Sequence, residues 1–455
     1  MSPPTVTSID RFLCRARRSP RAALLAAALL LAAPARAASP AAGPAAASLA
    51  PGFELHLPDA LALARRGNWE LLSAQADVAI ARANLRTARQ HPNPSLSVIT
   101  SRIHNDGLGD ATPLGNDLWS RGYDTVTQLG QTLELAGKRG LRRRAAAAAA
   151  DAARARLADN RRTLEAEVLR AYVAAALASA DVRIARESAS YLRDEARIAE
   201  VRWKAGDISR SDLDQIEIAA ARLDLEAHGA ENAALGQRVA LETLLGVSAP
   251  GGDIVIADSL EALVDSTGVA AQRPQGGVRP DLAAAQAEQH RADAAWRLEK
   301  AQRIPDPTLV LQFEHQPPDR PNTLGIGLAL PLPLWNRNTG SIEAARSARD
   351  QADIEAERAA AAIAADIASG RAALEEASSR WRRYRDELRP RSDSIRRSVS
   401  LAYEKGGASL LDLLEAQRND NDVRHATIQA ASDSAIAATQ LHAATTTIIP
   451  EVTRP

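Results

Sequence analysis

The sequence predicts a mainly α-helical fold with a small β part, and three observations point to it. Only 3% of the 455 residues are aromatic, whereas alanine is abundant, as in the run Ala145 to Ala150, and small side chains suit long helices that pack closely. Residues 138–203 contain no proline and could form a helix of about 100 Å. One pattern of helices and alternating segments occurs twice. The length would allow about three globular domains, but long helical hairpins fit these features better.

Residues 1–37 are predicted to be a removable export signal. Several arginines between Arg11 and Arg21 precede the apolar stretch Ala22 to Ala33, and Ala35-Arg36-Ala37 follows as a cleavage site. The apolar stretch is too short for the ~20 residues of a spanning helix, although a retained membrane anchor is the alternative. The single cysteine, Cys14, precedes this stretch, so the mature chain has neither a disulfide framework nor a thiolate metal cage. Residues 38–56 form an N-terminal linker.

The mature chain contains two copies of one pattern, residues 57–247 and 279–447. Residues 70–96 and 280–309 are both alanine-rich helical stretches that stop at a Pro-x-Pro, where an alternating segment begins. Residues 202–213 also align without gaps on residues 402–413. Each copy therefore runs helix, strand pair, long helix, break, helix. Residues 248–278 are a linker with a little structure of its own, placed at the equator between the copies, and residues 448–455 form a C-terminal tail.

The predicted helices are long enough to define elongated hairpins. The short helices, residues 58–91 and 209–247, would measure about 50 and 58 Å, so that end to end they match the long helix 138–203. The second copy repeats this arrangement with residues 340–403 as its long helix. Periodic helical patterns of this length indicate a coiled coil or a helical repeat.

The breaks, at about 203–212 and 403–412, carry their own turn chemistry. Gly206 and Gly406 stand where a helix end needs a left-handed residue. Ser209 and Ser409 stand at N-cap positions, each with an aspartate three residues on, as in a capping box. Capping accounts for all of these residues, but the occurrence of the same turn at the far end of both hairpins suggests a function.

Four alternating segments, about 94–103, 121–135, 307–316 and 323–334, are predicted to be strands. Spans of about 9 to 11 residues suit a tilted strand that crosses a membrane, although a half-buried soluble sheet shows the same alternation. Trp119, Tyr123 and Trp335 flank the strands as in an interfacial belt. Two hairpins alone are marginal and a barrel needs about eight strands, so several chains must contribute. The residues expected to face lipid are Leu309, Leu311, Phe313, Leu324, Ile326, Leu328 and Leu330.

Charge and motifs exclude several classes of function. The chain has 56 basic and 56 acidic residues, whereas a nucleic-acid binder needs a basic surplus. The eight histidines are scattered, so we expect surface or packing roles rather than metal ligation. The sequence lacks a nucleophile elbow, a phosphate loop and an HExxH motif. We therefore predict no enzyme activity, no cofactor and no resident metal site.

The duplicated order, the Pro-x-Pro segments and the Gly-x-x-Ser-x-x-Asp turns together resemble the outer membrane efflux protein family of the TolC type. In that family three chains share a twelve-stranded outer-membrane β-barrel and continue as an α-helical tunnel through the periplasm. The tips meet a periplasmic adaptor, and an inner-membrane pump supplies the energy. The resemblance implies a homotrimer in the outer membrane of a Gram-negative bacterium, with adaptor contacts at Gly206, Ser209, Asp212, Leu213, Gly406, Ser409, Asp412 and Leu413.

Residues 133–139 and 331–340 resemble the heavy-metal, CzcC-like branch, whose members pair with cation-exporting RND pumps. Both stretches occupy the junction between barrel and tunnel, through Gly137, Lys138, Arg139, Trp335, Asn336, Arg337 and Asn338. This resemblance implies passive conduction of divalent heavy-metal cations. The alternatives are a channel for drugs, organic compounds or type I protein secretion and, from another class, a soluble periplasmic coiled-coil scaffold.

Two further segments are rich in charged residues. Family members commonly carry acidic residues about two turns before the second tip glycine, but the comparable residues 391–397 are mostly basic here, so we carry over no acidic gate and name no gating residue. Basic residues gather at the start of the long helix, where acids are usually preferred: Lys138, Arg139, Arg142, Arg143 and Arg144. They are either balanced by nearby acids or anchored to lipid phosphates at the barrel rim.

Overall fold

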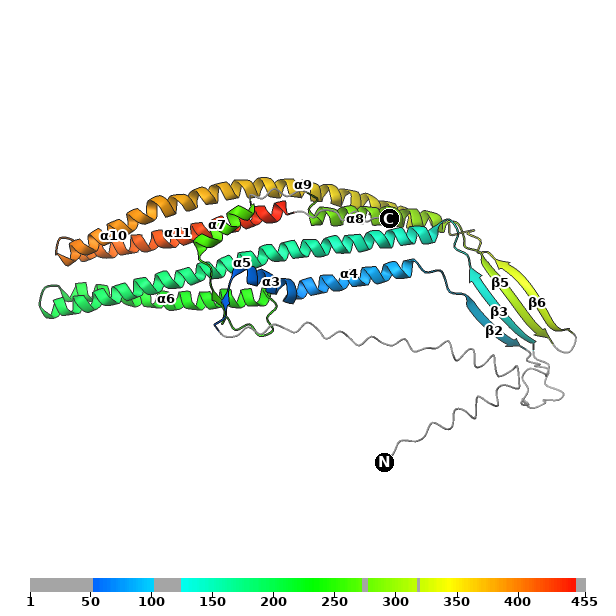
Figure 1. Cartoon of the computed structure of the whole chain (residues 1–455), viewed down its shortest axis with the longest axis horizontal. Coiled ribbons are helices and arrows are strands. Elements are labelled where there is room, and N and C mark those ends of the chain that lie inside the picture. The colour runs from blue at the N-terminus through cyan, green and yellow to red at the C-terminus, as the bar shows by residue number, and fades with distance from the viewer. Residues whose placement is uncertain (1–51, 102–123, 272–276, 317–319, 447–455) are drawn as a thin grey trace, which may run out of the picture. The chain divides into compact units, whose positions relative to one another are not determined.

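The computed structural model describes residues 52–101, 124–271, 277–316 and 320–446, which belong to one compact unit, residues 46–455 (Figure 1). The expected export signal, Trp119, Tyr123 and the C-terminal tail lie outside the described residues. None of the helices within the described ranges is long and apolar enough to cross a membrane.

The first repeat is built around one unbroken helix of 67 residues, which at 1.5 Å per residue extends about 100 Å. Figure 1 shows the shorter helices of this repeat following one another along it. The expectation of a single helix over 58–91 is wrong, because the Asn68 side chain accepts a hydrogen bond from the Leu71 N–H and caps a new helix. The helices are α3 (Leu57–Gly67), α4 (Trp69–Ala88), α5 (Lys138–Lys204) and α6 (Arg210–Leu244).

The second repeat follows the same plan with one irregularity. Its elements are α8 (Pro280–Gln302), α9 (Thr339–Arg383), the π-helical turn η2 (Tyr384–Leu388), α10 (Arg389–Glu404) and α11 (Leu410–Thr445). The predicted helix 340–403 is thus interrupted, with the Arg389 N–H bonded to the Tyr384 carbonyl five residues back. Pro390 follows, and its ring would clash with a carbonyl in a regular α-helix. A widened turn relieves that clash.

The helices pack in one row that combines both repeats. α5 packs against α4 and α6 on one side, and against α8 and α11 on the other. α9 packs against α8 and α11, and α10 packs against α11 (Figure 1). This order leaves α4 and α6 at one edge of the row, and α9 and α10 at the opposite edge.

The four predicted strands form one antiparallel sheet in the order β2-β3-β5-β6. Its strands are β2 (Ser95–Ser101), β3 (Asp124–Thr132), β5 (Thr308–Gln316) and β6 (Arg320–Ala329). The hairpins of the two repeats join through β3 and β5. The predicted ends of two strands are wrong: β3 stops at Thr132, and β6 stops at Ala329, so that Leu330 lies one residue beyond its strand. Pro331 and Pro333 lack the N–H that a longer β6 would need.

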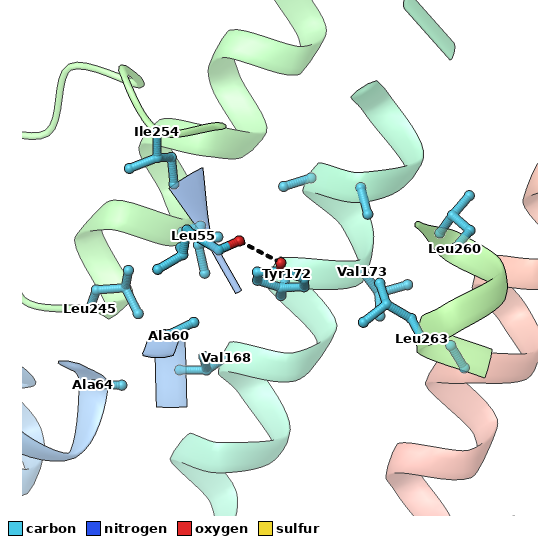
Figure 2. Close-up of a cluster of buried hydrophobic side chains, with 14 of the residues drawn as sticks. Leu55, Ala60, Ala64, Val168, Tyr172, Val173, Leu245, Ile254, Leu260 and Leu263 are labelled. Atoms are coloured by element: carbon cyan, nitrogen blue, oxygen red, sulfur yellow. Dashed lines mark hydrogen bonds between the residues drawn. The ribbon is translucent and has the colours of Figure 1, made fainter. Parts of the chain in front are cut away.

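The linker between the repeats encloses the main hydrophobic core with the N-terminal segment. Strand β4 (Val255–Ile256) pairs in parallel with β1 (Glu54–Leu55), and α7 (Leu260–Ala271) follows. Figure 2 shows Leu55, Leu245 and Leu263 gathered around Tyr172 of α5. The segment between the repeats is therefore structured rather than loose. We call β1, β4 and α7 together the clasp.

Asp258 is the polar centre of this clasp. Its two carboxylate oxygens lie 2.9 Å from His56 Nδ1 and 2.8 Å from the Tyr172 hydroxyl, and it also accepts the Leu57 N–H at 2.8 Å. The same hydroxyl lies 2.7 Å from the Leu55 carbonyl. Partial burial alone would raise the pKa of Asp258, but the hydrogen bonds from His56, Leu57 and Tyr172 together lower that pKa. Asp258 therefore stays ionised and holds the N-terminal segment against α5.

Replacing Tyr172 with Phe is expected to lower the free energy of unfolding by about 1 to 3 kcal/mol, because the Leu55 carbonyl and Asp258 lose a buried partner. Thermal unfolding of the purified protein, followed by its helical circular dichroism, measures the change. Tyr384→Phe is the matched control, since the Tyr384 hydroxyl makes no hydrogen bond within the described ranges. Equal losses in the two variants would contradict the role of the Tyr172 hydroxyl.

Candidate functional site

The two helical tips have the same turn. α5 ends at Lys204 and α6 begins at Arg210, while α10 ends at Glu404 and α11 begins at Leu410. Gly206 and Gly406 adopt the left-handed φ values of 84° and 77°. Both helix starts carry a complete capping box, in which Asp212 or Asp412 and the N-cap serine each accept the other's N–H at 2.9 to 3.2 Å. The predicted cap chemistry is confirmed.

The structure divides the predicted tip residues into two groups. Gly206, Ser209, Gly406, Ser409 and Asp412 are exposed, and Asp212 is half-buried. Leu213 and Leu413 are only 1% exposed, so they support the turns from inside and cannot belong to a docking surface. The reason is helical geometry, because each leucine follows its cap by one turn on the face that packs inward.

Sequence reasoning missed the apolar residue that the second tip presents. Leu411 is 69% exposed, whereas its neighbour Leu410 packs against the cluster of Ala199, Leu213 and Ile216 in the first hairpin. The two tips are therefore in contact through Leu410. The adjacent pair Leu410-Leu411 was the available signal, since consecutive helical residues cannot both face the same partner.

The sheet has one apolar face, and that face is exposed. Leu96, Leu129, Leu311 and Ile326 stand opposite one another across the four strands, and all four are exposed. The predicted lipid-facing residues of the second hairpin share this face, and Leu330 beyond the strand is exposed as well. Exposed apolar patches of this kind mark surfaces that meet a membrane or another protein.

The opposite face of the sheet is mostly polar or small, although Ile99, Val126 and Val310 also lie on it. Gln128 Nε2 donates to Gln312 Oε1 at 3.1 Å, and Ser97 and Gly325 continue the same row toward the two edges. A sheet with these two faces can separate an apolar environment from an aqueous one.

The first junction group joins the two repeats. Lys138 is buried, and its ammonium donates to Asp306 Oδ1 at 2.8 Å and to the Ile304 carbonyl at 2.5 Å. The Leu135 N–H also donates to Asp306 Oδ1, at 2.8 Å. Gly137 is the left-handed N-cap of α5, and Arg139 contacts His91. The segment that leaves β3 is thus held on the Pro-x-Pro segment of the second repeat.

The second junction group is held only within its own repeat. Asn338, a left-handed N-cap, donates through Nδ2 to the Glu299 carbonyl at 3.0 Å and to Glu299 Oε2 at 2.8 Å. Asn336 accepts the Asn338 N–H, while Arg337 is exposed and Trp335 is 93% exposed. No hydrogen bond or ion pair within the described ranges joins this group to the first one.

The basic cluster at the start of α5 is partly balanced by acids. Besides the Lys138–Asp306 pair, Arg142 pairs with Glu134 through bonds of 2.6 and 3.1 Å, and this hydrogen bonding lowers the pKa of Glu134. Arg143 and Arg144 are exposed and have no ion pair within the part of the chain that the structure describes. They are the members of the cluster that remain for lipid phosphates.

The described residues contain no group of three or more His, Cys, Asp or Glu side chains that could hold a metal ion. His56, His228 and His425 each pair with a single aspartate, and His425 lies 2.9 Å from Asp181. In the basic stretch near the second tip, Asp393 pairs with Arg396 and Arg397, and Arg396 also reaches Asp420.

A groove of about 710 Å³ lies over α5, between α6 and α11. Asp181 and Ser188 of α5, Arg222 and Glu226 of α6, and Gln417 of α11 line it. Among the residues that the structure describes, Gln417 Oε1 is buried without a hydrogen-bond partner. The sequence carried no signal for this groove, because its walls come from different repeats.

Several known proteins are similar to this chain. It is 27% identical over 366 residues to the cobalt-zinc-cadmium resistance protein CzcC of Cupriavidus metallidurans. The aligned residues cover 80% of this chain and 83% of that protein.

Among solved structures, the outer membrane protein VceC from Vibrio cholerae aligns with a TM-score of 0.68 and 19% identity over 86% of this chain and 96% of that one. The MtrE outer membrane channel of Neisseria gonorrhoeae aligns with a TM-score of 0.70 and 18% identity over 88% of this chain and 93% of that one. CusC aligns with a TM-score of 0.70 and 17% identity over 88% of this chain and 95% of that one. These likenesses show a shared fold. The sequence model described as outer membrane efflux protein matches residues 60–247 and 277–447, most of the chain, and this protein therefore belongs to the outer membrane efflux protein family.

Proposed function

We propose that this protein is the outer-membrane channel of a tripartite RND-type efflux system and that it conducts divalent heavy-metal cations passively from pump and adaptor to the outside. The observation that carries the proposal is the exposed apolar face of the four-stranded sheet, backed by a polar face that holds Gln128 and Gln312. The metal assignment rests on the similarity to CzcC, which is named for cobalt, zinc and cadmium resistance.

In this proposal several copies form the channel, because four strands per chain are too few to close a barrel, and the resemblance to the family implies that the copies are three. Twelve strands then span the outer membrane, with Leu311 and Ile326 toward lipid and Gln128 and Gln312 toward the lumen. The helices continue into the periplasm, and the junction groups around Lys138 and Trp335 lie where the barrel meets the tunnel.

The edges of the helix row support a ring of copies. Ile80 of α4 and Leu225 of α6 are exposed on the helices of one edge, and Ile354 is exposed on α9 at the other edge. Apolar side chains at both edges favour contact with a neighbour. Since the edges differ, each contact is heterologous, and a rotation that closes makes a ring.

The tips and the groove over α5 are the surfaces that we assign to the periplasmic adaptor. Gly206 and Ser209 are exposed at the first tip, and Gly406 and Ser409 are exposed at the second. The two tips are in contact through Leu410. The inner-membrane pump then delivers substrate to the adaptor and supplies the energy.

Conduction through such a passage needs weak, transient binding rather than a metal cage, because a tight ligand set would trap the exported ion. The scattered single pairs of histidine with aspartate, such as His425 with Asp181, fit this requirement. The protein itself carries out no reaction in this mechanism.

Deleting the gene is expected to raise sensitivity to divalent metals and leave drug sensitivity unchanged. Growth of the deletion strain, with and without a plasmid copy, is measured against Zn, Co, Cd, Ni, Cu and a drug panel. A strain that becomes sensitive to drugs or organic compounds alone would overturn the metal assignment and keep the channel. A strain without any change would overturn the efflux function.

A further inference from the structure

The two repeats meet once within each chain, and we propose that the same contact forms a second time, between copies. The segment that leaves β6, residues 330–334, would dock on the start of β2 of the next copy and the two residues before it, residues 93–98, with Leu330 opposite Leu96. This inference rests on the proposed ring of copies and adds its register and its seam residues.

The repeats define which residues are equivalent. Pro92-Asn93-Pro94 leads into β2 as Pro305-Asp306-Pro307 leads into β5. The pair Ser95 and Gly130 in the first hairpin corresponds to Thr308 and Ala329 in the second. By the same alignment, Leu133-x-Leu135 after β3 corresponds to Leu332-x-Leu334 after β6.

The contact within the chain serves as the template. Leu129 stands opposite Leu311, and Gln131 stands opposite Leu309. Beyond the strands, the Leu133 N–H donates to the Pro307 carbonyl at 2.9 Å, and the Leu135 N–H donates to Asp306 Oδ1 at 2.8 Å. The segment that follows β3 in the first repeat is thus hydrogen-bonded to the segment that leads into β5 in the second repeat.

The equivalent contact is missing at the other end of the sheet. β3 continues past Gly130 for two residues that pair with β5, whereas β6 stops at the equivalent position, Ala329. Leu332 and Leu334 are 67% and 61% exposed, compared with 46% and 43% for Leu133 and Leu135. The Asn93 side chain, equivalent to Asp306, is exposed and makes no hydrogen bond in the part of the chain that the structure describes.

Transferring the template predicts the register of the seam. The pair Leu129–Leu311 becomes Leu328 opposite Val98 of the next copy, and the pair Gln131–Leu309 becomes Leu330 opposite Leu96. An independent property agrees with this register, because the exposed side chains of Leu96, Val98 and Leu328 all lie on the apolar face of the sheet. A slip by one residue would place them on opposite faces.

The contact between copies would also provide hydrogen-bond partners for Asn93, Leu332 and Leu334. By analogy with Asp306, the Asn93 side-chain carbonyl would accept the Leu334 N–H of the neighbouring copy, and the Pro94 carbonyl would accept the Leu332 N–H. The segment from Leu330 to Leu334 would then lose much of its exposure, as its counterpart has in the first repeat.

Cysteine pairs test the register directly. In a Cys14→Ser background, which removes the single natural cysteine, Leu96→Cys combined with Leu330→Cys is expected to form disulfides between copies, because facing strand residues lie within disulfide reach. Isolated outer membranes are oxidised and run on gels with and without reductant. Covalent dimers and trimers that disappear on reduction are the expected result, and each single variant should give monomers.

Two matched pairs make the outcome decisive. Gln131→Cys with Leu309→Cys should close within the chain and stay at monomer mass, which shows that oxidation worked. Leu96→Cys with Ala329→Cys represents the slipped register and should not link copies. The register is overturned if this slipped pair links more efficiently, or if Leu96→Cys with Leu330→Cys gives no link while the chain is oligomeric in the membrane and supports metal tolerance. If the unmodified protein formed no oligomers in the membrane and supported no metal tolerance, the proposed function would be overturned instead.

Discussion

Ile326→Arg is expected to reduce assembly of the protein in the outer membrane at least severalfold. Ile326 stands in the middle of the apolar face of the sheet and is 79% exposed in the single chain. If that face meets lipid, an arginine near the bilayer midplane costs about 2 to 4 kcal/mol, a large part of the stability of a typical domain. Quantitative blots of the detergent-extracted outer-membrane fraction should show at least a severalfold loss.

The neighbouring residue provides the control. Gly327 points to the other face, and a side chain there would meet only Val310 Cβ at an ordinary 3.8 Å, so Gly327→Arg should assemble. A soluble scaffold behaves differently, because a charge at an exposed position usually changes stability by less than about 0.5 kcal/mol. Normal amounts of Ile326→Arg, released from envelopes by salt without detergent, would contradict the membrane assignment.

Replacing both tip glycines, Gly206 and Gly406, with Trp is expected to abolish efflux and leave the channel in the membrane. A Cβ at either position would meet no atom within 4 Å, so the bulk projects outward from the turn into the surface that we assign to the adaptor. Each left-handed position adds about 1 to 2 kcal/mol of backbone strain. Metal tolerance of the complemented deletion strain measures efflux, and the blot measures the channel.

Replacing both glycines with Asn separates docking from folding. Asparagine tolerates the left-handed conformation better than other residues and adds little bulk, so this variant should retain tolerance. If the Trp variant also conferred full tolerance while present at normal levels, the turns would be caps and nothing more.

Local chemistry in the sequence predicted much of the fold. Ser209 with Asp212, and Ser409 with Asp412, identified two helix starts because capping uses residues three positions apart. The alternation from Leu309 to Phe313 identified β5 and its apolar face, because the period of two is a property of the strand itself. The duplication predicted the element order of both repeats.

Contacts between distant residues could not be predicted in the same way. The pairing of β3 with β5 and the Lys138–Asp306 ion pair join residues more than 150 positions apart, and neither partner carries a local mark of the other. The buried Tyr172–Asp258 contact was missed for the same reason. The burial of Leu213 and Leu413 depends on which helical face packs inward, and the turn motif does not specify that face.

Two breaks had local signals that sequence reasoning overlooked. Asn68 is a good N-cap residue in the middle of an otherwise helical pattern, and it ends α3. Pro390 lies within the stretch predicted as one helix, and the π-helical turn η2 accommodates it.

The tandem duplication has a consequence for assembly. In a closed ring of three copies, seams of two kinds alternate, and the seam through β3, β5, Lys138 and Asp306 lies inside each chain. That seam closes at the effective concentration set by its own covalent linkage, independent of how much protein is present. Only the other half of the seams requires encounters between molecules. A split gene that encodes each repeat separately would face six bimolecular contacts in place of three, so ring formation would depend far more steeply on expression level.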